Sequence, residues 1–149
     1  MKAVPAILIS SALVVLFACS KDKFETKPRI EIKEYSAHDV PFQGSLTFTL
    51  HYYDKEGDLG NALFYARRVR INQLPLPPNQ EKADSFAYSL PDFPDKQDGE
   101  IIFSLDYNTL RESLSTSIND SMIFRFAVTD RAGNKSDTLT SDVIVVYPE

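Results

Sequence analysis

Hydrophobic and polar residues alternate with a period of two along most of the chain after residue 28. In one segment, Leu46, Phe48 and Leu50 alternate with Thr47 and Thr49. A β-strand points successive side chains to opposite faces, so this pattern predicts half-buried strands. Clusters of Pro, Gly, Asn and Asp separate the segments and are typical of turns. Seven strands are predicted, near residues 30–33, 45–52, 63–71, 85–90, 101–106, 122–129 and 143–147.

One segment departs from the strand period. Thr109 and Glu112 have the spacing of a helix capping box, and Leu110 and Leu114 lie one helical turn apart. We therefore expect a short helix near residues 109–116 that crosses between sheets and covers one open end of the core. Seven short strands with one crossover helix predict an all-β, antiparallel, immunoglobulin-like β-sandwich.

The N-terminus has a different pattern, because Lys2 precedes an apolar run that ends in Leu16, Phe17, Ala18 and Cys19. A positive residue followed by such a run indicates a secretory signal peptide. The run is shorter than the roughly 20 residues that a membrane-spanning helix needs. The last four residues resemble the lipobox of bacterial lipoproteins, with Leu16 and Ala18 at the positions that precede cleavage.

The lipobox resemblance implies that the chain is cut before Cys19 and that this thiol carries a diacylglycerol on an acylated N-terminus. Several acyl chains hold a protein stably on a membrane. The resemblance thus implies three parts: a signal peptide at 1–18, a lipidated and flexible tether at 19–27, and one domain at 28–149. Lys21 and Asp22 resemble the start of a surface-export signal of Bacteroidota lipoproteins. The expected location is the outer membrane, facing the periplasm or the cell surface.

A second resemblance supports the sandwich. The segment from Phe124 to Ser136 resembles the penultimate strand and following turn of fibronectin type III-like domains. Within it, Gly133 and Asn134 suit a turn with positive φ, and Asp130 can cap that turn with its carboxylate. The chain has no Trp for the usual core position of these domains.

The composition excludes several classes of function for this chain. The chain has 21 acidic and 16 basic residues and a formal net charge of −5, which argues against a nucleic-acid partner. Its single cysteine precludes an internal disulfide, so the domain must rely on core packing. His38 and His51 are the only histidines, and motifs of zinc hydrolases, serine hydrolases and phosphate-binding loops are missing. We expect a protein that is not an enzyme.

The chemically richest loop follows the second predicted strand. It places acidic side chains at alternate positions, Asp54, Glu56 and Asp58, with glycines that let the backbone turn. Calcium collects six to eight oxygen ligands, so this loop is a candidate calcium site, with Asp130 or Asp137 as a distant contributor. The alternative is a solvated turn in which Asp54 caps backbone amides.

The next predicted strand carries candidate recognition residues. Phe64 and Tyr65 can offer aromatic faces to a sugar. Arg67, Arg68 and Arg70 form a basic cluster, although strand alternation places Arg67 on the face opposite to the other two.

Beyond this strand, residues 74–78 (Leu-Pro-Leu-Pro-Pro) form an extended apolar ridge that a partner could use, or a stiff connection between the sheets.

Together these patterns predict a membrane-anchored cell-envelope lipoprotein that acts as a non-catalytic protein-interaction or assembly module. The alternative is a carbohydrate-binding accessory lipoprotein of a glycan-uptake system, assisted by calcium.

Overall fold

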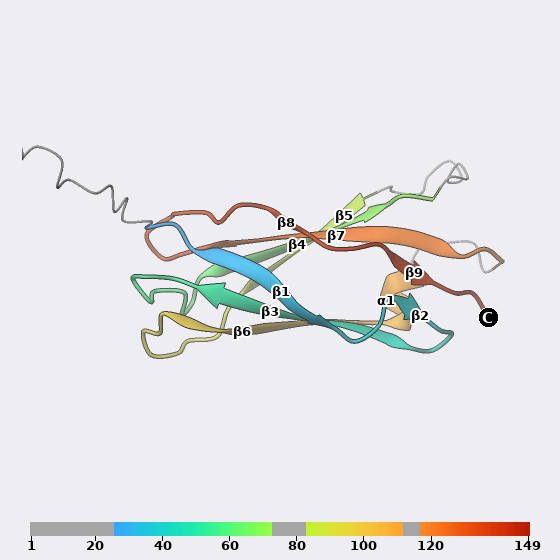
Figure 1. Cartoon of the computed structure of the whole chain (residues 1–149), viewed down its shortest axis with the longest axis horizontal. Helices are drawn as coiled ribbons and strands as arrows, with labels where there is room; N and C mark the ends of the chain where they lie inside the picture. Colours follow the sequence, from blue (N-terminus) through green and yellow to red (C-terminus); the bar gives the residue numbers. More distant parts are fainter. Residues whose placement is uncertain (1–25, 73–82, 112–116) are drawn as a thin grey trace, which may run out of the picture.

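Two β-sheets pack face to face with one short helix at an end (Figure 1). The structure is a computed structural model, and it describes residues 26–72, 83–111 and 117–149. The lipobox residues Leu16, Ala18 and Cys19, most of the predicted tether and the ridge at 74–78 lie outside the described residues. No helix among the described residues is long and apolar enough to cross a membrane.

The smaller sheet has three antiparallel strands in the order β1–β3–β6. The larger sheet has the order β2–β9–β7–β4–β5, with β8 paired to β7. The strands of the smaller sheet are β1 (Arg29–Tyr35), β3 (Ser45–Tyr53) and β6 (Asp98–Asp106). Those of the larger sheet are β2 (Asp39–Val40), β4 (Leu63–Arg70), β5 (Ala83–Ser89), β7 (Asp120–Thr129), β8 (Leu139–Thr140) and β9 (Ile144–Val146).

The predicted all-β sandwich is confirmed. All seven predicted strands are present, and the first, second and fifth of them form one sheet, as in immunoglobulin-like domains. Two strands were not predicted, β2 and β8, because segments of two residues are too short to show a period. The expectation of a wholly antiparallel sandwich needs one correction, since β2 pairs with β9 in parallel.

The predicted crossover helix is present as α1 (Tyr107–Arg111), which connects β6 in one sheet to β7 in the other. It begins two residues earlier than predicted, because Asp106 provides the N-cap. The Asp106 carboxylate accepts hydrogen bonds from the backbone N–H and the hydroxyl of Thr109, each at 3.0 Å. Thr109 is therefore not the cap. Leu110 is fully buried, as expected for a helix that covers the core.

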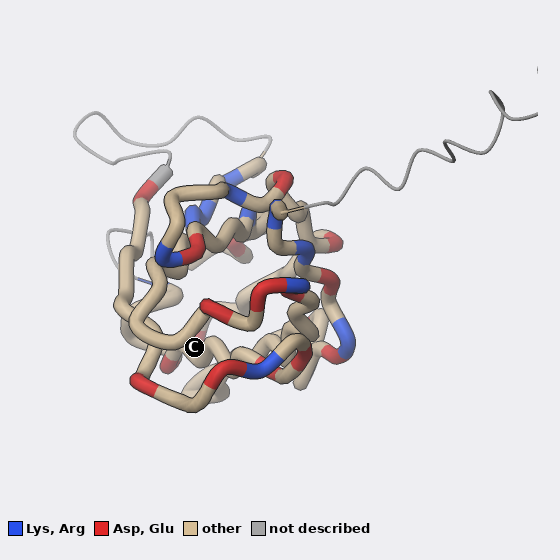
Figure 2. The backbone as a smooth tube through the Cα atoms, turned by 90° about the vertical axis from the view of Figure 1, so that its left-hand side faces the viewer, with Lys and Arg blue, Asp and Glu red and all other residues tan. Residues whose placement is uncertain are grey.

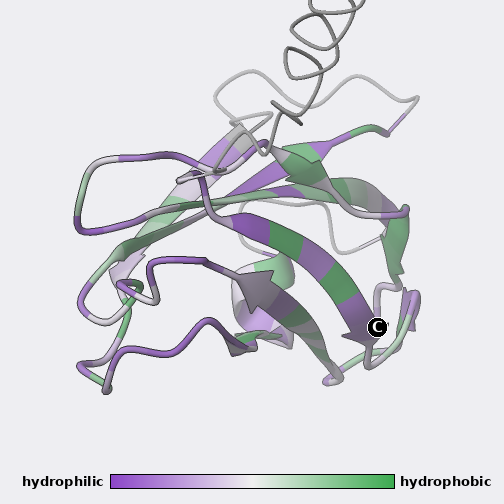
Figure 3. Cartoon of the chain, turned by 60° about the vertical axis from the view of Figure 1, so that its left-hand side comes forward, coloured by the Kyte–Doolittle hydropathy of each residue, from purple (hydrophilic) through white to green (hydrophobic). Residues whose placement is uncertain are grey.

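The inward-facing residues of the strands form one aromatic-rich core. In β3 the buried positions alternate with partly exposed ones, and the hydropathy colours of the strands show the same alternation (Figure 3). The ring of Phe48, in the smaller sheet, lies 5.0 Å from the rings of both Phe124 and Phe126 in the larger sheet. These ring contacts join the two sheets across the core.

Two arginines of β4 lie inside the molecule, which corrects their interpretation as a recognition surface. Arg68 and Arg70 are 1% and 3% exposed, respectively, while Arg67 on the opposite face is exposed. The guanidinium of Arg68 donates to Asp84 of β5 at 2.8 Å and to the carbonyl oxygen of Leu110 in α1 at 2.9 Å. These bonds satisfy a charge that would otherwise be costly to bury.

Candidate metal site

Two turns at the same end of the sandwich have the same construction. One, from Asp54 to Asp58, follows β3, and the other, from Asp130 to Asn134, follows β7. In each, a glycine three residues after the aspartate donates its N–H to the aspartate carbonyl at 3.2 Å. Those glycines have φ values of 76° and 91°, a region that favours glycine.

The aspartate side chains also have the same role in both turns. The backbone N–H of Asp58 donates to the Asp54 carboxylate at 2.8 Å, and that of Asn134 donates to the Asp130 carboxylate at 2.7 Å. The prediction that Asp130 caps the turn after β7 is thus confirmed, and so is the capping of backbone amides by Asp54. Each carboxylate is held in place by its own turn.

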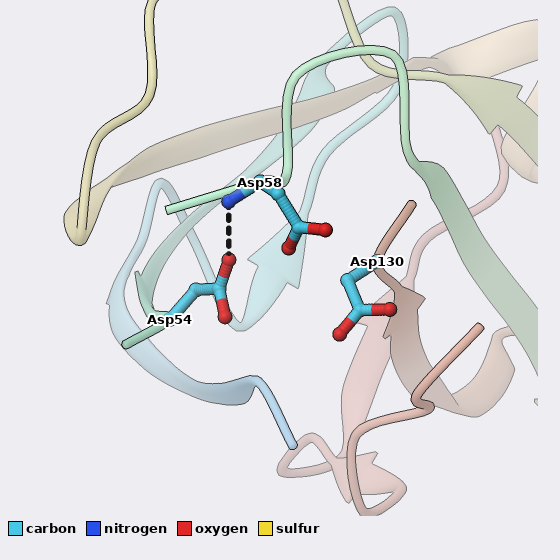
Figure 4. Close-up of side chains that lie close together, drawn as sticks. All are labelled: Asp54, Asp58 and Asp130. Atoms are coloured by element: carbon cyan, nitrogen blue, oxygen red, sulfur yellow. Dashed lines mark hydrogen bonds between the residues drawn. The ribbon is translucent and has the colours of Figure 1, made fainter. Parts of the chain in front are cut away.

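The two turns bring three carboxylates together, one from each of Asp54, Asp58 and Asp130 (Figure 4). One oxygen of each group lies within 4.8 Å of the others. Asp54 is 2% exposed and Asp130 is 5% exposed. Among the described residues, the buried Oδ1 atoms of Asp54 and Asp58 have no hydrogen-bond partner, and no Lys or Arg forms a salt bridge with the three groups.

The electrostatics of this cluster disfavour three free charges. The pKa of Asp54 is raised from its ordinary 3.8 to about 6, mainly by burial. The hydrogen bond from the Asp58 N–H lowers this pKa, and the neighbouring carboxylate of Asp58 raises it. Clustered carboxylates are relieved either by binding a proton or by binding a cation. Oxygen-only ligands of this kind suit calcium, a hard cation.

A neighbouring loop fixes the geometry of the first turn. The carbonyl of Gly57 accepts a hydrogen bond from the N–H of Lys96 at 3.1 Å, and the N–H of Asp54 donates to the carbonyl of Gln97 at 2.7 Å. A Cβ atom added to Gly57 would lie 2.9 Å from the Lys96 nitrogen. The carboxylates are therefore positioned by a packed backbone.

The sequence-predicted metal ligands divide into two groups. Asp54 and Asp58 come together, and Asp130 joins them as one of the two distant contributors considered. Glu56 is exposed and lies outside the cluster, and exposed Asp137 pairs with Lys27. A signal for Asp130 was present in the sequence, because Asp-Lys-Glu-Gly-Asp and Asp-Arg-Ala-Gly-Asn share the spacing of aspartate and glycine directly after two strands.

The two aromatic residues predicted to bind a ligand, Phe64 and Tyr65, lie on opposite faces of β4. Phe64 is 1% exposed and belongs to the core, so its assignment to a binding surface is wrong. Successive side chains of a strand point to opposite faces, so Phe64 points inward and Tyr65 points outward from β4. Tyr65 is half-buried there, and the ammonium group of Lys135 lies 5.3 Å from the centre of its ring.

Comparisons with known proteins give similar structures only. No family model and no curated protein matches the chain. The sporulation control protein Spo0M from Bacillus subtilis is 12% identical over 83% of this chain and 50% of that chain, with a TM-score of 0.41. The chain thus spans half the length of the Spo0M structure.

Two further structures are similar at the same level. The soluble domain of PmoD from a Methylocystis species is 13% identical, over 80% of this chain and 88% of that one, with a TM-score of 0.35. A beta-glucosidase from Kluyveromyces marxianus in complex with glucose is 8% identical, over 83% of this chain and 15% of that one, with a TM-score of 0.34. Similarities of this size carry no argument about family or function.

Proposed function

We propose that this chain is a membrane-anchored cell-envelope lipoprotein whose sandwich is a non-catalytic binding module with a calcium ion at Asp54, Asp58 and Asp130. The observation that carries the proposal is the convergence of three carboxylates from two distant turns. One of them, Asp54, is buried with an oxygen that lacks a hydrogen-bond partner among the described residues. Such an atom needs a hydrogen-bond donor, a proton or a cation.

Charge and ligand chemistry favour calcium over a proton near neutral pH. Three ionised carboxylates carry three negative charges, and a divalent cation leaves a net charge of −1 at the site. Asp54, with a pKa of about 6, is mostly ionised at pH 7. Asp58 is only half-buried, so water and main-chain carbonyls can complete the six to eight oxygen ligands that calcium needs.

The anchor places this site outside the cytoplasm. Cys19 supports that part of the proposal through the resemblance of residues 16–19 to a lipobox. With Cys19 lipidated, the sandwich is a head displayed on a short tether. Its loops and sheet faces are then available to a partner in the envelope, facing the periplasm or the cell surface.

Calcium binding is tested by the melting temperature of the detergent-solubilised full chain. We expect millimolar calcium to raise it by several degrees relative to EDTA, because a ligand at about 100 times its Kd stabilises a protein by about 2.7 kcal/mol. Asp58→Asn and Asp130→Asn should abolish the increase. Glu56→Gln, in the same turn but outside the cluster, should keep it.

The matched variants distinguish a lost site from a lost fold. Without calcium, Asp58→Asn should melt at or above the temperature of the unmodified chain, because it removes repulsion from Asp54. A calcium response in Asp58→Asn as large as that of the unmodified chain would contradict the proposed site, and so would no response in the unmodified chain.

The anchor requires a separate experiment. Cells supplied with a labelled fatty acid should incorporate it into the unmodified chain and not into Cys19→Ser, and only the unmodified chain should sediment with the outer membrane. Equal labelling of both would contradict lipidation at Cys19.

A second candidate function is binding of carbohydrate. The observation that favours it is the position of Tyr65, which lies half-buried on the outer face of the larger sheet and next to a groove.

A further inference from the structure

The outer face of the larger sheet brings together small, aromatic and basic side chains. Tyr65 in β4 lies opposite Ala87 of β5 on one side and Ala127 of β7 on the other. Two residues further along β4, Arg67 lies opposite Arg125 of β7. The two alanines leave space beside the Tyr65 ring, and the arginines border that space.

A groove of about 510 Å³ occupies this part of the face. Among its lining residues, three are basic, Arg67, Arg125 and Lys135, and none is Asp or Glu. The hydroxyl groups of Ser85 and Thr138 also line it. In a chain with 21 acidic and 16 basic residues, a groove with only basic charges is a local reversal of the overall charge.

The basic residues of the larger sheet differ in where their side chains lie. In Figure 2, Lys and Arg occur together with Asp and Glu in the upper layer, which holds the larger sheet. Arg68 and Arg70 contribute to that layer but point into the core, so Arg67 and Arg125 supply the charge on the outside.

Repulsion between Arg67 and Arg125 destabilises the sheet, and a bound anion would remove that repulsion. Like charges directly opposite each other on adjacent strands destabilise a sheet. Among the described residues, no salt bridge or side-chain hydrogen bond involves Arg67 or Arg125. Guanidinium groups bind carboxylate and sulfate through paired, charge-assisted hydrogen bonds, so two adjacent free guanidinium groups form a site for such an anion.

We propose that this groove binds an acidic polysaccharide, with Arg67 and Arg125 on its carboxylate or sulfate groups and Tyr65 against its sugar rings. The hydroxyls of Ser85 and Thr138 are placed to bond with sugar hydroxyls. The inference rests on the proposed function as a binding module and names its ligand class.

The groove fits a sugar chain better than a peptide or a membrane surface. Peptides bind mainly through apolar anchors in pockets or by adding a strand to a sheet edge. Phe86 and Phe126 also line this groove, but both pack into the core, so the other apolar residues beside Tyr65 are alanines. The strands β4 and β7 are interior strands of the sheet. A membrane surface is flat, whereas this site is hollow and has only three basic residues.

The test is isothermal titration of the detergent-solubilised full chain with polygalacturonate, dextran sulfate and uncharged dextran. We expect both acidic polymers to bind and dextran not to bind. Arg67→Gln combined with Arg125→Gln should weaken binding at least tenfold, because each charge-assisted hydrogen bond contributes at least that factor. Tyr65→Ala should also weaken it, and added salt should weaken it further.

The chain offers a matched control on the other sheet, where the guanidinium of Arg29 lies 4.3 Å from the ring centre of exposed Tyr53. Arg29→Gln combined with Tyr53→Ala removes a similar pair and should leave binding unchanged. An equal loss in this control would overturn the assignment to the groove.

Other ligands give different outcomes. If polyglutamate binds as tightly as polygalacturonate and responds equally to the arginine variants, the site is for an acidic protein segment. If vesicles with phosphatidylglycerol bind instead of the polymers, the face is a membrane contact. Either result overturns the polysaccharide proposal. The calcium and lipidation tests are unaffected by it, so failure here is distinguishable from failure of the proposed function.

Discussion

At the scale of single residues, Asp54 has the most unusual environment in the candidate site. Its carboxylate is almost fully buried, accepts one backbone hydrogen bond and lies beside two other carboxylates. Burial raises its pKa to about 6, so near neutral pH it exchanges a proton readily. At the proposed calcium site a proton and a calcium ion would compete for this carboxylate, and their effects on stability would have opposite dependence on pH.

This competition predicts how stability changes with pH in EDTA. Because the pKa of Asp54 is higher in the folded chain than its ordinary 3.8, the folded state binds the proton more tightly. The stabilisation is fully present below pH 3.8 and is lost as the pH rises through about 6. The melting temperature of the unmodified chain minus that of Asp54→Asn should fall over this range.

Saturating calcium should reverse the trend, because only the ionised carboxylate binds the ion. Melting curves between pH 4 and pH 7.5, in EDTA and in calcium, measure both slopes. A difference that does not vary with pH in EDTA would show that Asp54 has an ordinary pKa.

At the scale of secondary-structure elements, Arg68 joins three of them. It lies on β4, pairs with Asp84 of β5, and donates to carbonyl groups of α1. The carbonyls of a short helix have few partners of their own at its C-terminal end. A buried cation at that position both satisfies the carbonyls and ties the crossover helix to the larger sheet.

Removal of the Arg68 side chain should strongly destabilise the folded chain. Arg68→Ala leaves the Asp84 carboxylate and the carbonyl of Leu110 without their partner. Breaking a fully buried ion pair costs about 3–5 kcal/mol, and because the Asp84 side chain is 33% exposed we expect a loss at or below the lower end of that range. Urea unfolding followed by circular dichroism measures the change. Arg67→Ala, one residue away and exposed, should change the unfolding free energy by no more than about 0.5 kcal/mol. Similar losses in both variants would contradict the interior role of Arg68.

At the scale of the whole molecule, an aromatic cluster joins the two sheets. Phe103 of the smaller sheet contacts rings from β3, β4, β5 and β7, including Phe126 with a centroid distance of 5.8 Å. The described chain contains no disulfide, so this packing has a large share in holding the layers together.

The cluster predicts a contrast between two adjacent residues of β6. Phe103→Ala should lower the unfolding free energy by about 3–5 kcal/mol, because it opens a cavity between the sheets. Ile102→Ala should cost far less, since Ile102 points outward and is 69% exposed. Urea unfolding midpoints compare the two, and equal costs would contradict a core centred on Phe103. Typical domains have only about 5–15 kcal/mol in total, so Phe103→Ala is also expected to unfold at much lower temperature.

The amino-acid sequence by itself determined the fold class, the seven main strands and the local shape of two Asp-x-x-Gly turns. These depend on short-range physics: alternation of side chains along a strand, the positive φ that glycine allows, and hydrogen bonds within five residues. The short spacing between Asp54 and Asp58 likewise places their carboxylates in one cluster, whereas the calcium ion there is a proposal.

Only the tertiary structure decided which face of each strand is buried and which distant residues meet. A period of two groups Arg68 with Arg70, and Phe64 with Ala66, but does not say which face of β4 packs against the other sheet. Charge suggested that the arginines face solvent, yet Asp84 and the α1 carbonyls, distant in sequence, provide partners for buried Arg68. Asp120, also distant in sequence, pairs with buried Arg70. Asp130 joins Asp54 and Asp58 because β3 and β7, in different sheets, end on the same side of the sandwich. Contacts of this kind depend on how the sheets pack, and local sequence does not encode that packing.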